Sequence, residues 1–260
     1  MKRETQLTVL LALCTAAILI IYNTFLGEAF YPDLSDVLTV ALGIFSSAAA
    51  FHAYASLKNE GDSSAPRFWW MAMGLLLWVA ADFMVIFYTF ALGAEIPAVS
   101  EADIFWMLGY LPLAYSLFLA FSSVKFQGKA MLVALCTYIV LMGLLYMSLS
   151  GSLVDFEASP LENLVNLAYP LEDILLLSFA VPLVGAYFSP NAGKSWLMLA
   201  FGLFLTGLGD LMFLQINAID VPDPTAITSM FFMLDYLWIG FSALVYVEEA
   251  RALRKRTAKK

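Results

Sequence analysis

Long apolar segments alternate with short polar loops along the whole chain. A helix needs about 20 mainly apolar residues to cross the hydrocarbon core of a membrane, and eight segments of about this length are present. The pattern therefore predicts an all-α membrane protein with eight transmembrane helices. The expected spans are 7–27, 36–57, 68–93, 102–124, 129–150, 163–187, 195–217 and 226–249.

The basic residues fall in every second loop. All 13 Lys and Arg residues lie near the N-terminus, in the second, fourth and sixth connections or in the C-terminal tail, whereas the other connections carry acids and no base. Basic residues are retained on the cytoplasmic side during membrane insertion. We therefore expect a multi-pass protein of the plasma membrane with both termini cytoplasmic, ending in a basic cytoplasmic tail over residues 251–260.

Composition narrows the classes of function. Of the 260 residues, 62% are hydrophobic and 13% are charged, whereas soluble proteins average roughly 45–50% and 25%. The expected spans leave no room for a soluble domain. The two Cys residues and the single His follow no metal-site spacing, and no phosphate-loop or zinc-hydrolase motif is present. We therefore expect no metal, no cofactor and no nucleic-acid partner, but contact with membrane lipids.

The two halves of the chain resemble each other. A shift of 128 residues lays the seventh span on the third, and past a loop two residues shorter the eighth span follows the fourth. Matched Gly and Asp residues within a matched topology predict two parallel four-helix repeats, residues 1–127 and 128–250. The matched pairs include Gly74 with Gly202, Asp82 with Asp210, and Tyr110 with Tyr236.

Five acids lie inside the expected spans. Each aspartate near the centre of a membrane helix costs about 2.5–3.5 kcal/mol on insertion scales, so these residues are the functional candidates. A rise of 1.5 Å per residue brings all five to the middle and outer layer of the membrane. We expect an outward-facing acidic cavity there that binds a ligand. The acids are Asp82, Glu172, Asp173, Asp210 and Asp235.

Aromatic residues accompany these acids. Trp78 lies one turn from Asp82, and Tyr169 lies one turn from Asp173, a spacing that places each pair on one helix face. The alternative is a structural role, in which buried acids bond to Tyr, Ser or the backbone and specify helix packing. Asp103, at the head of the fourth span, is expected to be a helix-start residue. The aromatic candidates are Trp78, Tyr110, Tyr169 and Tyr236.

Short motifs resemble the multi-helix membrane sensory domains that prokaryotes fuse to diguanylate cyclases and histidine kinases. The resemblance covers roughly residues 68–250, and no cyclase or kinase sequence follows the last span. It implies a free-standing sensory module that binds a small-molecule or lipid ligand and signals through a separate protein. The motifs are AD at 81–82, SEAD at 100–103, LGYLPL at 108–113 and YPLEDILL at 169–176.

A second resemblance implies an enzyme. The stretch GLFLTGLGD at 202–210 is similar to an element of the lysoplasmalogenase family, which also has eight helices in two halves. Under this resemblance Asp82 and Asp210 would be the catalytic acid and base of a membrane hydrolase of vinyl-ether lysolipids. Ala81 stands where that family has Gly. A third hypothesis, drawn from the parallel repeat and the proline-bearing sixth span, is a proton-coupled transporter.

Overall fold

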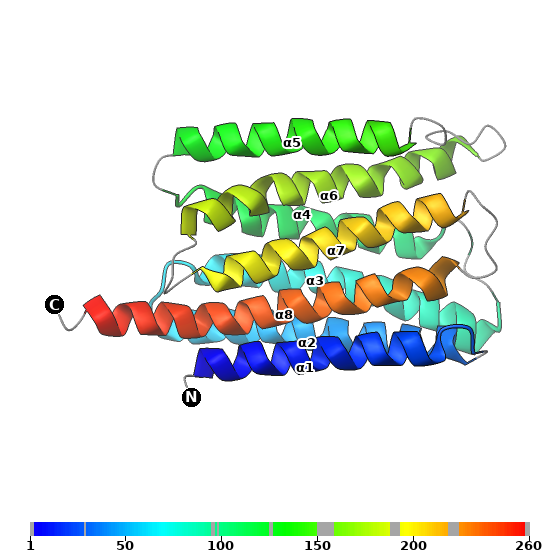
Figure 1. Cartoon of the computed structure of the whole chain (residues 1–260), viewed down its shortest axis with the longest axis horizontal. Helices are drawn as coiled ribbons and strands as arrows, with labels where there is room; N and C mark the ends of the chain where they lie inside the picture. The colour runs from blue at the N-terminus through cyan, green and yellow to red at the C-terminus, as the bar shows by residue number, and fades with distance from the viewer. Residues whose placement is uncertain are drawn as a thin grey trace.

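Every regular element in the computed structural model is a helix within the residues it describes (Figure 1). This confirms the predicted all-α class. The described residues are 3–28, 30–94, 97, 99–124, 127–149, 159–187, 193–217 and 224–257.

Within the described residues, eight α-helices cross the bundle in alternating directions, so the start of α1 and the end of α8 lie at the same end of the molecule (Figure 1). Among the described residues, seven helices are long and apolar enough to cross a membrane. The fifth helix contributes a shorter apolar stretch, Met131–Leu144. The elements are α1 (Arg3–Phe25), α2 (Tyr31–Asn59), α3 (Ala65–Ile86), the π-helix η1 (Phe87–Leu92), α4 (Glu101–Phe121), α5 (Gln127–Leu149), α6 (Pro160–Tyr187), α7 (Lys194–Asn217) and α8 (Pro224–Thr257).

Helix α8 continues past the expected span 226–249 to Thr257, so the described part of the predicted basic tail is helical. Arg251 and Arg254 both donate to Glu60 at the end of α2, so these basic side chains hold the last turns of α8 against a neighbouring helix. Residues 258–260 lie outside the described part.

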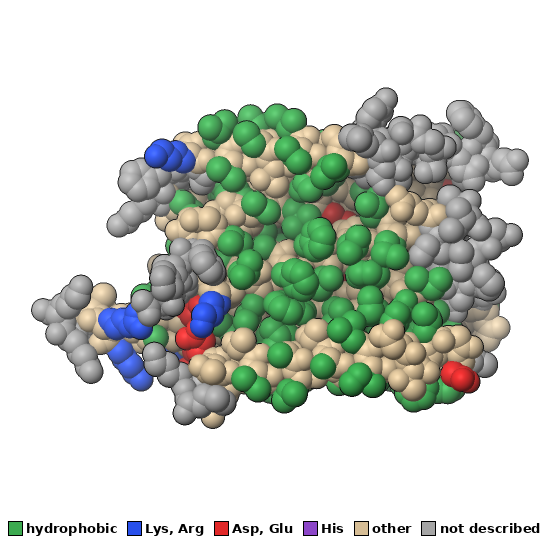
Figure 2. Space-filling model, in the orientation of Figure 1, with side chains coloured by type: hydrophobic (Ala, Val, Ile, Leu, Met, Phe, Trp, Pro, Cys, Tyr) green, Lys and Arg blue, Asp and Glu red, His purple; other side chains and the backbone are tan. Residues whose placement is uncertain are grey.

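The described Lys and Arg side chains gather at the end that holds both termini, called here the basic end (Figure 2). Ion pairs link helices there: Lys194 contacts Glu4 at 2.7 Å and Arg251 contacts Glu60 at 2.7 Å. The alternation of charge seen in the sequence thus corresponds to two chemically different ends of the bundle. Some of the predicted loop and terminal charges lie outside the described residues, namely Lys2, Glu95, Lys125, Asp155, Glu157, Asp220, Asp223, Lys259 and Lys260.

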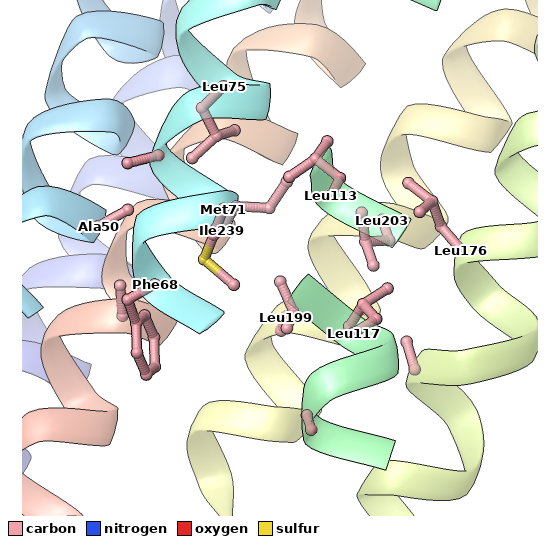
Figure 3. Close-up of a cluster of buried hydrophobic side chains, with 14 of the residues drawn as sticks. Ala50, Phe68, Met71, Leu75, Leu113, Leu117, Leu176, Leu199, Leu203 and Ile239 are labelled. Carbon is pink, nitrogen blue, oxygen red and sulfur yellow. The ribbon is translucent and has the colours of Figure 1, made fainter. Parts of the chain in front are cut away.

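Helix α8 lies near the centre of the bundle and packs against α1, α2 and α7, while α3 packs between α2 and α4. Figure 3 shows the apolar core between these helices, where Leu75 and Ile239 are fully buried. The peripheral helices α1 and α5 pack mainly on α8 and α6 respectively. They expose apolar side chains such as Leu13 and Met131, as expected for surfaces that face lipid.

Two close helix crossings depend on glycine. A Cβ atom on Gly74 of α3 would lie 2.7 Å from the carbonyl oxygen of Gly109 and 2.6 Å from the side chain of Leu113, both on α4. A Cβ atom on Gly202 of α7 would lie 2.7 Å from the side chain of Ile239 on α8. Small residues at these points let the helix backbones approach closely and so bring the α3–α4 and α7–α8 side chains together.

Candidate functional site

The five membrane-embedded acids lie on four neighbouring helices. Asp82 lies in the second half of α3, Asp210 in the second half of α7, and Asp235 in the first half of α8. Glu172 and Asp173 lie near the middle of α6. Asp173 and Asp235 are almost fully buried, with 3% and 2% of their surface exposed.

Asp82 is held by two hydrogen-bond donors. The indole Nε1 of Trp106 lies 3.0 Å from one carboxyl oxygen, and the phenol oxygen of Tyr236 lies 2.7 Å from the other. Both oxygens of this acid therefore have a donor. Such a fully bonded group is suited to joining α3, α4 and α8, the structural role considered as the alternative for these acids.

Asp173 and Asp210 share one tyrosine. The phenol oxygen of Tyr110 lies 2.8 Å from Oδ1 of Asp173 and 3.2 Å from Oδ2 of Asp210. A phenol carries a single O–H, so it donates to only one of these oxygens at a time. Both contacts are hydrogen bonds only when one of the two carboxyl groups is protonated. That carboxyl group then donates to the phenol oxygen, while the phenol donates to the other carboxylate.

Further acceptor atoms around this tyrosine lack donors. Oδ2 of Asp173 and Oε2 of Glu172 are buried and have no hydrogen-bond partner among the described residues. Glu172 also interacts electrostatically with Asp210. We define the acidic cluster as Tyr110, Glu172, Asp173 and Asp210. Among the described residues it contains more acceptor atoms than donors.

Asp235 occupies a neighbouring position on α8. The hydroxyl of Thr206 on α7 donates to its Oδ2 at 2.9 Å, while its Oδ1 has no partner among the described residues. It interacts electrostatically with both Asp82 and Asp210. Asp235 therefore lies between the bonded acid on α3 and the acidic cluster.

The ring of Trp78 packs against the rings of Tyr110 and Tyr236. Its ring lies 5.0 Å from that of Tyr110 and 6.2 Å from that of Tyr236, centroid to centroid. Its indole N–H donates to the backbone oxygen of Trp106 at 3.0 Å. The indole N–H of Trp78 thus bonds to the backbone of α4 and not to Asp82, its neighbour on the helix.

Tyr169 bonds to a different acid from the one its spacing predicted. Its phenol donates to Asp103 of α4 at 2.6 Å, although its place one turn from Asp173 predicted a pairing with that residue. The long side chain reaches across to the start of α4. Asp103 itself accepts from the backbone N–H of Ser100 at 2.7 Å within a capping box, which confirms its role as a helix-start residue.

Two residues of the site were not expected. Trp106 is not among the aromatic candidates named from the sequence, yet it donates to Asp82. Its position one turn before Tyr110 on α4 was the available signal, because that spacing places both on one helix face. Gly207 is the other: a Cβ atom there would lie 3.2 Å from the Cβ atom of Asp173, so the missing side chain leaves room for this acid.

Positive charge is absent from this layer within the described residues. The ion pairs among the described residues all lie at the basic end, away from the acids. Their basic partners are Arg3, Lys194, Arg251 and Arg254. Burying several unpaired carboxylates is very costly. The acids are therefore compatible with a folded bundle only when protons or a bound cation balance their charge.

The described residues contain no group of three or more His, Cys, Asp or Glu side chains that could hold a metal ion. Comparisons of the chain with protein-family models, with curated proteins and with solved structures found no match.

Proposed function

We propose that this chain is a multi-pass membrane sensory module whose acidic cluster binds a small positively charged ligand, either a proton or the ammonium group of an organic cation. The observation that carries the proposal is the sharing of Tyr110 by Asp173 and Asp210. One phenol proton cannot serve two ionised carboxylates, and a single positive charge added at this point satisfies both.

The surrounding atoms support the same ligand chemistry. Oδ2 of Asp173 and Oε2 of Glu172 are buried acceptors without a donor, and an N–H or O–H donor bound beside them would satisfy them. An anion would add to the repulsion between the acids and would be rejected. Trp78, whose ring contacts that of Tyr110, supplies an aromatic face of the kind that attracts organic cations.

We also infer that the two halves, residues 1–127 and 128–250, are parallel repeats. Tyr236 of the second half donates to Asp82 of the first, and Tyr110 of the first half donates to Asp210 of the second. The matched residues thus exchange partners between the halves.

The close glycine contacts follow the same correspondence. Gly74 approaches residues 109 and 113, and Gly202 approaches the backbone of residue 235 and the side chain of residue 239. In each half the glycine therefore approaches the same two positions of the following helix.

The inferred repeats differ where the acidic cluster lies. In the first half a Cβ atom on Gly43 of α2 would meet Val79 and Tyr236, and in the second half Asp173 of α6 meets Gly207 and Tyr110. Under this correspondence Gly43 matches Asp173, and Val79 matches Gly207. This exchange of size and charge favours the second half as the ligand-binding half.

For the orientation, we propose that the basic end faces the cytoplasm and that the protein lies in the plasma membrane. The retention of basic residues on the cytoplasmic side supports this arrangement. A separate signalling protein would then read the ligand state at the basic end, where Arg251 and Arg254 of α8 bond to the end of α2.

The full chain in nanodiscs of zwitterionic lipid provides the test. Thermal unfolding is followed first over a range of pH without added amines, and then at fixed pH with propylammonium or its neutral counterpart propanol. We expect a stabilisation by acid or by propylammonium that is lost in Asp173→Asn and Asp210→Asn.

Asp33→Asn is the matched control, because Asp33 is an exposed acid at the start of α2, and it should keep the full response. A response to pH alone identifies the ligand as a proton, and a response to propylammonium identifies an organic cation. Equal behaviour of the wild type and both cluster variants in the two arms would refute the proposal.

A further inference from the structure

A small hollow lies near the basic end, between α3, α4, α7 and α8. Its volume is about 10 Å³, enough for about one water-sized atom. Three serine hydroxyls and one guanidinium group line it together with apolar and aromatic side chains. The lining includes Arg67, Ser116, Ser195, Trp196, Ser242 and Tyr246.

Arg67 is the charged residue of this hollow. It is only 8% exposed, and its Nη1 has no hydrogen-bond partner among the described residues. The guanidinium carbon lies 5.7 Å from the ring centroid of Trp196 and 5.5 Å from that of Tyr246. The aromatic rings attract the cation through their faces, and the side chain of Tyr187 also interacts with the guanidinium. These neutral neighbours leave Nη1 without an acceptor among the described residues.

Carboxylates that could neutralise Arg67 are bonded elsewhere. Glu249, a buried acid at this end, accepts from the backbone N–H of Lys194 at 2.8 Å and from the hydroxyl of Ser195 at 2.7 Å. Among the described residues no acid forms an ion pair with Arg67, although Arg251 and Arg254 both do so with Glu60. Arg67 is therefore a buried positive charge without a counter-charge.

We infer that Arg67 binds an anionic oxygen of a phosphate group, carried either by a phospholipid headgroup or by free phosphate. A buried, unpaired charge is strongly unfavourable until an opposite charge meets it. The guanidinium presents planar N–H donors that match the oxygens of phosphate. The hollow holds one such oxygen, while the rest of the group remains at its mouth.

The position of the hollow supports this ligand. Arg67 is the third residue of α3, which begins at the basic end, and phosphate headgroups lie at this level of a membrane. The hydroxyls of Ser195 and Ser242 already donate to Glu249 and to the backbone oxygen of Ile239. The guanidinium is the charged donor that lines the hollow, and the site is chemically independent of the acidic cluster.

The test uses the delipidated full chain in maltoside micelles, which contain no phosphate. Inorganic phosphate is compared with chloride at equal ionic strength, and phosphatidylglycerol is compared with a neutral galactolipid. Thermal unfolding reports stabilisation, and native mass spectrometry counts the bound lipids. We expect the wild type to be stabilised by inorganic phosphate or by phosphatidylglycerol. The compound that stabilises it identifies the source of the phosphate group.

Three variants separate the site from general attraction to the basic end. Arg67→Gln should weaken binding at least tenfold, and Arg67→Lys, which keeps the charge but loses the planar fork, should weaken it less. Lys58→Gln removes an exposed base of α2 and should bind as wild type does. If wild type gains no stability in either arm, or if Arg67→Gln binds equally well, the inference is wrong. The wild-type comparison stands even if Arg67→Gln does not fold.

Discussion

The phenol oxygen of Tyr236 on α8 lies 2.7 Å from a carboxyl oxygen of Asp82 on α3. Trp106 bonds to the other oxygen of the same acid. Asp82 is therefore fully bonded, unlike Asp173, which retains a buried oxygen without a donor. This contrast between a satisfied and an unsatisfied acid leads to different expectations for the two residues.

Asp82→Asn should destabilise the protein by about 1–3 kcal/mol, because an amide has one acceptor oxygen where two donors need one each. Asp173→Asn should change the free energy of unfolding by less than about 1 kcal/mol, because the amide still accepts from Tyr110 and can donate to Asp210. Chemical unfolding of both variants in nanodiscs without added cation measures the difference. Equal losses would contradict the distinction between the two acids.

Tyr110→Phe should also destabilise the protein by about 1–3 kcal/mol, because it removes the donor shared by Asp173 and Asp210 and leaves two buried carboxyl groups facing each other. Tyr138→Phe provides the control, since Tyr138 is an exposed tyrosine of α5, and it should unfold as the wild type does. The comparison is made by thermal unfolding under identical conditions. A stable Tyr110→Phe protein would show that the phenol does not hold the cluster together.

Gly207→Val should destabilise the protein by about 1–3 kcal/mol through overpacking, because a Cβ atom at this position already lies 3.2 Å from Asp173. Adding Asp173→Gly should recover much of the loss, since the pair would then reproduce the Gly43 and Val79 contact of the first half. A double-mutant cycle should therefore give a coupling of at least about 1 kcal/mol. Additive effects would count against the inferred correspondence between the halves.

Lysoplasmenyl lipids incubated with purified protein should release no aldehyde. An ether hydrolase would need Asp82 and Asp210 to act on one bond, but Asp82 is occupied by Trp106 and Tyr236, and Asp210 contacts Tyr110. Mass spectrometry of the lipids after incubation checks this expectation. Aldehyde release that disappears in both Asp82→Asn and Asp210→Asn would instead support the enzyme and displace the sensory proposal.

The helices and the candidate acids could be predicted from the sequence because their signals are local. Apolar runs of sufficient length predict membrane helices whatever their neighbours are, and an acid inside such a run is conspicuous in itself. The choice of Tyr110 and Tyr236 as companions of the acids also required only the match between the two halves. Both tyrosines do donate to acids.

The pairing between helices could not be predicted in the same way. Tyr169 was assigned to Asp173 by helical spacing, but its phenol reaches Asp103 on α4. Spacing gives the face on which a side chain lies, not the neighbour that the face meets. The bond from Trp106 to Asp82 was missed for the same reason. The bonds from Arg251 and Arg254 to Glu60 likewise join residues that are far apart in the sequence, so helical spacing could not indicate them.

The exchange of partners between Tyr236 and Asp82 also has a consequence for biosynthesis. Asp82 enters the membrane with α3, but its donor Tyr236 belongs to α8, the last helix of the described chain to be made. Until that helix is inserted, the carboxyl group lacks one of its two hydrogen bonds. The early helices therefore cannot reach their final polar packing while synthesis continues, and the bundle becomes complete only after its C-terminal helix arrives.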